Sequence, residues 1–342
     1  HLITGPAIAA FDLLGAANAE FWASQAMAVL LATLSVMALW TVLRALDVKH
    51  AWIWTALALI ISGFSFRLLL AKASSLAVGA FIVVLGAMAL RRPATAFFAG
   101  ALFALSHGGW IIAIIAAVAM LAGDVIARRF VQDDAWEIAI RDAPWRAFGG
   151  LVTGIALGLV IHPNCFEIFQ FLWVQTFKAG LLTSSAVIQG REWLPSNPGE
   201  LLAEIAPLVI AGLLGALGLM FTPIRMTEKK DDGTLRPDYL NRMRLVIMLA
   251  LPTAITVALT LKSARFIEYL VPALTLWLAS LWQLVDPRRL KAELARARND
   301  LSPLARRVIV PLLVTLAATL ALHPASRPWS SLRRGAKTFD SY

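Results

Sequence analysis

Ionisable side chains beside long apolar stretches are the residues of this 342-residue sequence that are best placed to do chemistry. The clearest group is Arg265, Glu268 and Tyr269. On a helix, Arg265 shares a face with the residues three and four positions later, so a cation, a carboxylate and a phenol can converge. A guanidinium offers a planar fork for phosphate oxygens, and a neighbouring carboxylate can hold that fork in place. The spacing therefore favours a phosphate site; the alternative is an Arg–Glu pair that anchors a helix end at a membrane interface.

Two further bases and a histidine stand in comparable positions. Arg67 and Lys72 flank four apolar residues, with no acid nearby in the sequence. Such a pair suits a lipid-linked phosphate or pyrophosphate, although both side chains can equally snorkel to lipid headgroups. His107 occupies a Ser-His-Gly-Gly turn. An imidazole there can transfer protons, or it can simply stabilise the turn.

The stretch 162–200 is the longest one between apolar runs on the side of these residues. It opens with His162, and a proline follows at once and ends the preceding run. Aromatic residues then recur at helical spacing over 166–177, which predicts an amphipathic helix lying in the membrane interface. Glu192 and Trp193 follow in a turn-rich segment. An indole beside hydrogen-bonding groups is typical of carbohydrate sites, and an aromatic stripe is equally typical of a membrane anchor.

The composition shows what must position these residues. The chain is 59% hydrophobic and 15% charged, whereas a soluble domain carries about 25% charged residues. Its apolar runs can cross a hydrocarbon core of roughly 30 Å as helices. We therefore predict an all-α, polytopic integral membrane protein and exclude a soluble enzyme. About ten spans are expected, at 22–43, 51–66, 73–90, 94–106, 109–123, 147–162, 201–222, 244–261, 266–285 and 308–323.

The net charge of +10 is an orientation signal. Lysine and arginine gather in alternate loops, beginning with the loop after the first run, and the positive-inside rule makes those loops cytoplasmic. The candidate residues above then fall on the non-cytoplasmic side. This asymmetry makes nucleic acid an unexpected partner. The loops contain no glycine-rich phosphate loop, Cys/His metal-ligand spacing or nucleophile elbow, which argues against an ATP-driven pump and against a cytoplasmic catalytic domain. A divalent metal stays open as a cofactor, although the sequence shows no ligand set for it.

These residues together resemble the polytopic glycosyltransferases of the GT-C type. The resemblance rests on the His-Pro-Asn at 162–164 with the amphipathic segment 166–177, on the Glu-Trp-Leu-Pro at 192–195, and above all on Arg-Phe-Ile-Glu-Tyr-Leu-Val-Pro at 265–272. It implies a transmembrane transferase domain over 1–323 with a non-cytoplasmic tail over 324–342. It also implies a bacterial inner-membrane location and a sugar donor carried on polyprenyl phosphate.

The resemblance also implies a role for each candidate. Arg265, with Arg67 and Lys72, would offset the charge that develops on the departing phosphate. Glu268 would orient Arg265, and Tyr269 would donate a hydrogen bond to phosphate or sugar. The remaining residues of the expected pocket wall are His107, His162, Glu192 and Trp193.

One feature of the family is missing from the sequence. An acidic residue in the first outer loop usually serves these enzymes as base or metal ligand, and that segment would precede His1. Asp12 and Glu20 are the acids near this end, and neither stands in a matching motif. We therefore expect a fragment that is inactive alone, and we assign no catalytic residue, cofactor or metal ligand.

Two other functions remain open. A transporter or flippase for a lipid or amphiphile would use the same bases to capture an anionic headgroup. Transporters usually show internal repeats and polar residues near the bilayer midplane, and we find no repeat in this sequence. A non-catalytic membrane scaffold is the third alternative. An acid in an outer loop upstream of His1 would favour the transferase.

Overall fold

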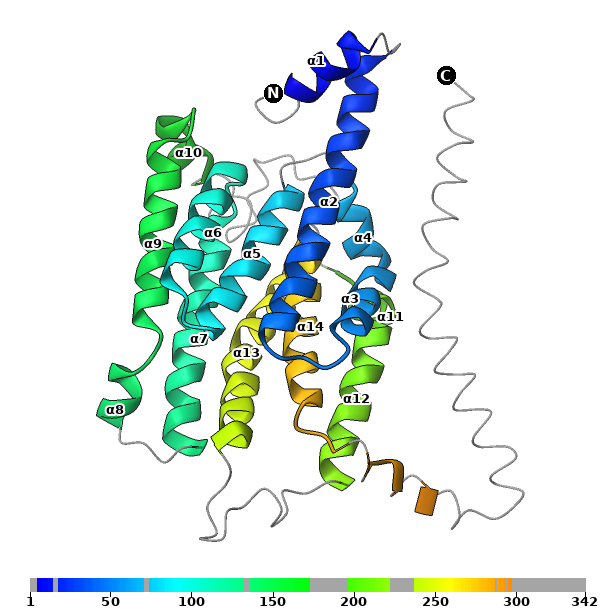
Figure 1. Cartoon of the computed structure of the whole chain (residues 1–342), viewed down its shortest axis with the longest axis vertical. Helices are drawn as coiled ribbons and strands as arrows, with labels where there is room; N and C mark the ends of the chain where they lie inside the picture. The colour runs from blue at the N-terminus through cyan, green and yellow to red at the C-terminus, as the bar shows by residue number, and fades with distance from the viewer. Residues whose placement is uncertain are drawn as a thin grey trace, which may run out of the picture.

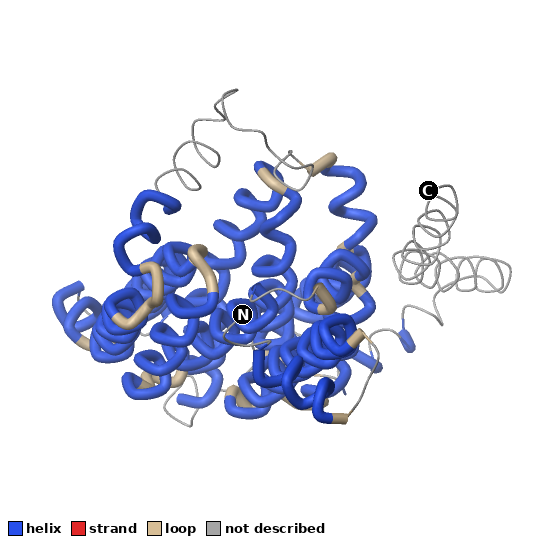
Figure 2. The backbone as a smooth tube through the Cα atoms, turned by 90° about the horizontal axis from the view of Figure 1, so that it is seen from above, coloured by secondary structure: helices blue, strands red, loops and turns tan. Residues whose placement is uncertain are grey.

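The computed structural model describes residues 5–14, 18–70, 74–131, 136–172, 196–221 and 237–286, with 288, 290–292 and 295–296. Within these ranges the chain forms helices joined by turns and contains no strand (Figure 2). The predicted all-α class is therefore confirmed for the part of the chain that the structure describes.

The helices follow the expected apolar runs closely (Figure 1). In chain order they are α1 (Gly5–Leu13), α2 (Ala19–Ala45), α3 (Ala51–Ile60), α4 (Ser62–Leu68), α5 (Ser74–Ala89), α6 (Pro93–Ser106), α7 (Trp110–Val131), α8 (Trp136–Arg141), α9 (Trp145–Val160), α10 (Cys165–Leu172), α11 (Pro198–Glu204), α12 (Ala206–Phe221), α13 (Pro237–Lys262), the 3-10 turn η4 (Ala264–Phe266) and α14 (Ile267–Trp282).

Several of these helices are long and apolar enough to cross a membrane. Five segments qualify, and the number rises to seven if the bent pairs α3–α4 and α11–α12 each count as one span. The bends are 90° and 77°. The protein is thus an integral membrane protein with several apolar helices. The five segments are Ala19–Ala45, Trp110–Val131, Trp136–Val160, Tyr239–Lys262 and Ala264–Trp282.

The expected count of ten spans is only partly met. Nine of the expected runs coincide with a helix or a bent pair, and the tenth, 308–323, lies outside the described residues. The runs 73–90 and 94–106 became α5 and α6, of 16 and 14 residues. At 1.5 Å per residue these helices are about 24 Å and about 21 Å long, which is short for a core of roughly 30 Å.

Helix α14 lies at the centre of the assembly (Figure 1). It packs against α13, α12, α3, α4 and α5, and every residue from Ile267 to Leu276 is buried. A helix that is apolar on all sides is expected in such a central position. The first residues of α14 are therefore buried inside the bundle, near one of its ends.

Helices α6 and α9 approach each other through glycine. Gly150, Gly154 and Gly158 stand four residues apart on α9, and each lies against a carbonyl group of α6. A Cβ at Gly154 would clash with the carbonyl oxygen of Phe97. Small residues at this spacing let membrane helices pack backbone to backbone.

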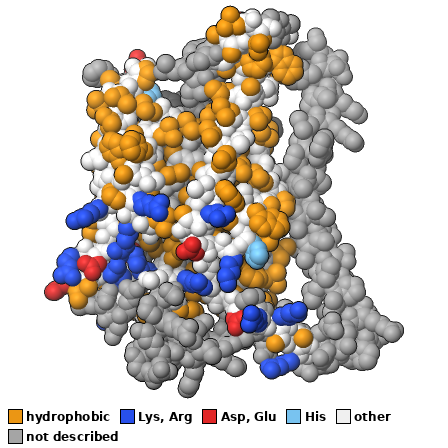
Figure 3. Space-filling view, in the orientation of Figure 1, with side chains coloured by type: hydrophobic (Ala, Val, Ile, Leu, Met, Phe, Trp, Pro, Cys, Tyr) orange, Lys and Arg blue, Asp and Glu red, His pale blue; other side chains and the backbone are white. Residues whose placement is uncertain are grey.

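The two ends of the bundle differ in charge. Side chains of lysine and arginine gather toward the lower end in Figure 3, beneath a surface that is mainly apolar. There Arg91, Arg128 and Arg244, from three different expected loops, all contact Asp124. We name this the arginine end. The opposite end holds the turn between α6 and α7 with His107 and the connection from α13 to α14, and we name it the His107 end. This agrees with the alternation of loops expected from the sequence.

Candidate functional site

The chain reverses sharply between α13 and α14. Ser263 is extended, with φ −151° and ψ 123°, so α13 ends there and the 3-10 turn η4 follows. Arg265 lies in η4, whereas Glu268 and Tyr269 lie in the first turn of α14. The sequence predicted one α-helical face for these three residues, whereas Arg265 lies in the 3-10 turn just before α14.

Arg265 meets His107 at this end of the molecule. Its Nη2 lies 3.0 Å from Nε2 of His107. The other ring nitrogen, Nδ1, accepts a hydrogen bond of 2.8 Å from the backbone N–H of Gly109. The contact joins the turn between α6 and α7 to the start of α14, which are far apart in the sequence.

The two neighbours of His107 are both hydrogen-bond donors. A guanidinium has no acceptor, and a neutral imidazole has one acceptor nitrogen and one N–H. His107 can therefore accept fully from Arg265 or from Gly109, but not from both, and a protonated ring could accept from neither. In accordance with this, burial and the nearby charge of Arg265 lower the pKa of His107 to about 4. The imidazole is thus neutral at pH 7 and is a weaker partner for Arg265 than an anion would be.

Tyr269 occupies the centre of the cluster. It is 1% exposed, and its ring stacks on Phe103 at 6.2 Å and makes a T-shaped contact with Phe81 at 5.1 Å, both measured between ring centroids. A Cβ at Gly109 would lie 3.3 Å from the phenol oxygen, so the glycine leaves room for that group. Among the described residues, no group forms a hydrogen bond with this oxygen. A buried hydroxyl without a partner is unfavourable, which makes this oxygen a candidate ligand contact.

Arg67 belongs to the same cluster. The charges of Arg67 and Arg265 both act on the phenol of Tyr269, so the two guanidinium groups lie within electrostatic reach of one point. Arg67 stands in the last turn of α4, which is tied to α5 because Ser75 Oγ donates to the carbonyl oxygen of Leu68 at 2.8 Å. One cation from α4 and one from η4 therefore act electrostatically on the same buried hydroxyl.

The structure brings together five of the nine candidate residues. Glu268, which is 2% exposed, adds a carboxylate beside Tyr269. His162 lies in the turn between α9 and α10, at the flank of the bundle in Figure 1, and its Nδ1 accepts from the N–H of Asn164 at 3.1 Å. Lys72, Glu192 and Trp193 lie outside the described residues. The gathered residues are Arg67, His107, Arg265, Glu268 and Tyr269.

Sequence reasoning missed a carboxylate near this cluster. A Cβ at Gly63 on α4 would meet the carboxylate of Glu204 and would lie 3.3 Å from Cδ1 of Ile267. Glu204 is therefore close to the start of α14. It is half-buried and ends α11, at the corner where α12 begins. The sequence does contain a signal for this residue. Glu204 is an acid within the apolar run 201–222, near the end of that run that is expected on the same membrane side as Arg265.

A second charged cluster occupies the arginine end. Asp124 is fully buried, and its carboxylate contacts Nη2 of Arg91 and Nε of Arg128 at 3.3 Å each, together with Nε of Arg244. Burial and the charge of Arg244 lower the pKa of Arg91. The i, i+4 spacing of Asp124 and Arg128 was a usable sequence signal. Searched as far as it is described, the chain holds no group of metal-ligating side chains.

The geometry thus gives one mixed cluster at the His107 end and one arginine-rich cluster at the opposite end. No protein-family model and no curated protein matches the chain. Architecture and composition together identify an integral membrane protein that is all-α, with five to seven candidate spans, within the residues that the structure describes.

Proposed function

We propose that the protein is a membrane glycosyltransferase of the GT-C type that uses a polyprenyl-phosphate sugar at the His107 end. The observation that carries the proposal is that Arg265 contacts His107 while the charges of Arg265 and Arg67 both act on the buried Tyr269 phenol. By the positive-inside rule this end is non-cytoplasmic. The ten-span topology and a bacterial inner-membrane location belong to the same proposal.

The chemistry follows from the charges of the cluster. An acceptor hydroxyl or amide attacks the anomeric carbon, the bond from that carbon to the phosphate oxygen breaks, and the acceptor loses its proton. The departing polyprenyl phosphate gains one negative charge. Arg265 and Arg67 offset that charge, while Glu268 orients Arg265 and the Tyr269 phenol donates to phosphate or sugar.

His107 has two roles in this scheme. First, its Nε2 contacts Arg265 until a donor phosphate replaces the imidazole as the partner of the guanidinium. Burial and, after it, the charge of Arg265 lower the pKa of His107. The phosphate then offsets the second of these causes, so that the pKa of His107 rises. An imidazole with a pKa nearer to neutrality can take the acceptor proton. Glu204 is the second candidate base, because it is half-buried and close to the start of α14.

Substitution of Arg265 tests the proposal. Transfer from a panel of polyprenyl-phosphate hexoses is measured in full-length protein and divided by the amount of folded, detergent-extracted protein. Arg265→Ala is expected to lower transfer by roughly 10²–10³-fold, since it removes a contact to the leaving group. Arg265→Lys restores only part of the rate, because a point charge remains without the bidentate fork. Glu268→Gln is milder, because the amide oxygen still accepts from the guanidinium.

A purely structural role predicts a different pattern. The Arg265→Ala and Glu268→Gln proteins would then fold in lower yield and melt at lower temperature, with unchanged transfer per folded molecule. Unchanged specific activity in Arg265→Ala rejects the catalytic assignment.

The bent helices favour a transporter as the second candidate. The pairs α3–α4 and α11–α12 turn by 90° and 77°, and transporters place broken helices at their substrate sites. Movement of a fluorescent anionic lipid across proteoliposomes distinguishes the two functions. Movement without sugar transfer supports the transporter, and sugar transfer without movement supports the enzyme.

A further inference from the structure

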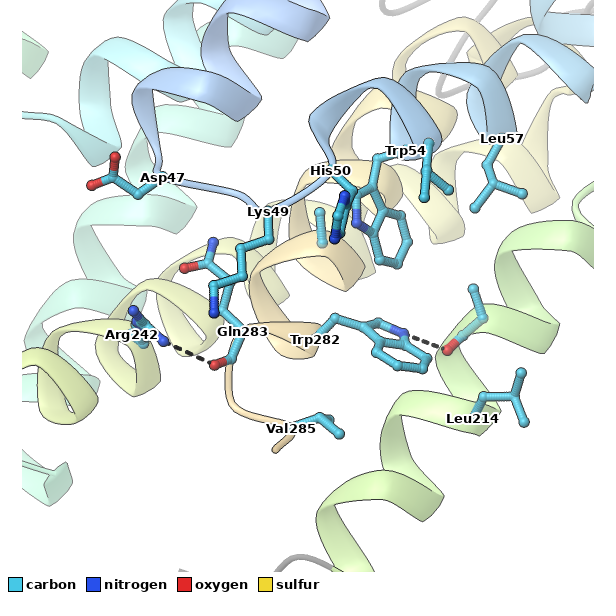
Figure 4. A pocket seen from close by; sticks show the side chains of 13 residues that line it. Asp47, Lys49, His50, Trp54, Leu57, Leu214, Arg242, Trp282, Gln283 and Val285 are labelled. Atoms are coloured by element: carbon cyan, nitrogen blue, oxygen red, sulfur yellow. Dashed lines mark hydrogen bonds between the residues drawn. The ribbon is translucent and has the colours of Figure 1, made fainter. Parts of the chain in front are cut away.

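Two cavities lie side by side at the arginine end. One, of about 560 Å³, has Arg91, Arg242 and Arg244 in its wall. The other, of about 400 Å³, is lined mainly by apolar side chains and is drawn in Figure 4. Asp47, Arg242 and Gln283 belong to both walls, so the two cavities adjoin each other, and we name them together the groove.

The polar half of the groove carries an excess of positive charge. Arg91 and Arg244 are positioned from behind by buried Asp124, which does not line the cavity. Arg242 donates to the main-chain carbonyl oxygen of Gln283 at 3.1 Å, as Figure 4 shows. The wall thus presents three guanidinium groups and one carboxylate, that of Asp47. Such a wall attracts an anion with several oxygens.

The apolar half is shaped by two indoles. Trp54 and Trp282 lie with ring centroids 6.5 Å apart, and Nε1 of Trp282 donates to the carbonyl oxygen of Ala211 at 2.8 Å. Because this N–H is satisfied, Trp282 offers the groove an apolar face. Ile53 and Leu214, in the same wall, are 39% and 50% exposed. These two residues stand on α3 and α12, both parts of candidate spans, so the groove opens toward the surface that faces lipid.

We propose that this groove binds one membrane lipid with an anionic phosphate headgroup, taken from the leaflet at the arginine end. The phosphate lies among Arg91, Arg242 and Arg244, and an acyl chain runs along Trp54 and Trp282. A soluble phosphate compound would leave the apolar half exposed to water, whereas a lipid fills both halves. The site is distinct from the cluster at the His107 end and does not depend on the proposed transfer reaction.

Native mass spectrometry of the full chain, released from detergent, tests the headgroup contact. Dioleoyl phosphatidylglycerol and dioleoyl phosphatidylcholine are titrated separately. We expect tighter binding of the anionic lipid, and Arg242→Gln should weaken that binding by roughly fivefold, as expected for one basic residue near an anionic headgroup. Arg146→Gln is the matched control, because Arg146 is exposed at the same end and does not line the groove. Equal losses in the two variants, or equal binding of the two lipids, would overturn the proposal.

A second pair of variants tests the acyl-chain contact. Leu214→Trp fills the apolar half, whereas Leu213→Trp adds the same bulk at a neighbouring, 61% exposed position outside the groove. We expect Leu214→Trp alone to weaken binding of the anionic lipid by several-fold. Competition with 10 mM inorganic phosphate should displace little lipid. Full displacement by phosphate would identify a site for free phosphate and overturn the lipid assignment. Equal binding of the lipid by both tryptophan variants would show that no acyl chain occupies the apolar half, and would overturn it as well.

Discussion

His107 should make the stability of the protein depend on pH in a way that one substitution removes. Its two ring nitrogens face the guanidinium of Arg265 and the N–H of Gly109, so the structure holds the imidazole in its neutral form. The pKa is lowered from 6.5 to about 4. Between these values the unfolded chain binds a proton that the folded protein does not, and the free energy of unfolding therefore decreases as the pH falls.

The magnitude follows from the shift. Each pKa unit corresponds to about 1.4 kcal/mol, so the loss reaches at most about 3 kcal/mol when the pH is lowered from 7 to 4. The loss sets in as the pH falls through 6.5 and levels off once the pH has fallen through 4. The direction is the opposite of that for a histidine stabilised by a carboxylate.

The assay compares wild type with His107→Asn. Asparagine keeps an oxygen that can accept from the N–H of Gly109 but does not titrate in this range. Apparent melting temperatures are recorded in detergent by tryptophan fluorescence from pH 4 to 8. The wild-type curve should fall more steeply than the variant curve between pH 6.5 and 4. Parallel curves over this interval would refute the conclusion that the folded protein keeps His107 neutral.

Two further predictions concern the packing. Asp124→Asn should lower the free energy of unfolding by about 3–5 kcal/mol, because it leaves buried cations without their countercharge; Asp142→Asn, at a 41% exposed side chain, should cost less than about 1 kcal/mol. Similar losses in thermal unfolding of the two variants would contradict the ranking. Gly154→Ala should cost about 1–3 kcal/mol, because the new methyl group meets the carbonyl of Phe97. Gly149→Ala, where nothing lies within 4 Å, should be neutral or slightly stabilising in the same measurement, and equal effects would reject the close approach of α6 and α9.

Much of the helical architecture could be predicted from the length of the apolar runs. Charges and turns interrupt these runs wherever a helix must leave the hydrocarbon, so the helix positions were predicted well. The runs that became α5 and α6 were predicted to be full spans, but the helices have only 16 and 14 residues and are short for a membrane crossing. The bends in α3–α4 and α11–α12 also escaped prediction, because a uniformly apolar run contains no periodic signal for a change of direction.

The candidate site was predictable in part. Arg265, His107 and Arg67 were expected on one side, and the structure brings them together around Tyr269. The contact between Arg265 and His107 depends on how α6, α7 and α14 pack. The spacing of residues along the sequence does not indicate this packing. Glu204 was overlooked because it lies within an apolar run, and the whole run was assigned to a membrane span.

In the proposed transferase, Arg265 binds the phosphate of a lipid-linked donor at the His107 end. Photocrosslinking with a polyprenyl phosphate that carries a diazirine next to the phosphate tests it most directly, with the adducts mapped by mass spectrometry. We expect adducts within 107–110 and 264–269 that disappear in Arg265→Ala and persist in Arg242→Gln. Adducts that are absent from both segments of the wild type, or that are unchanged in Arg265→Ala, would contradict it.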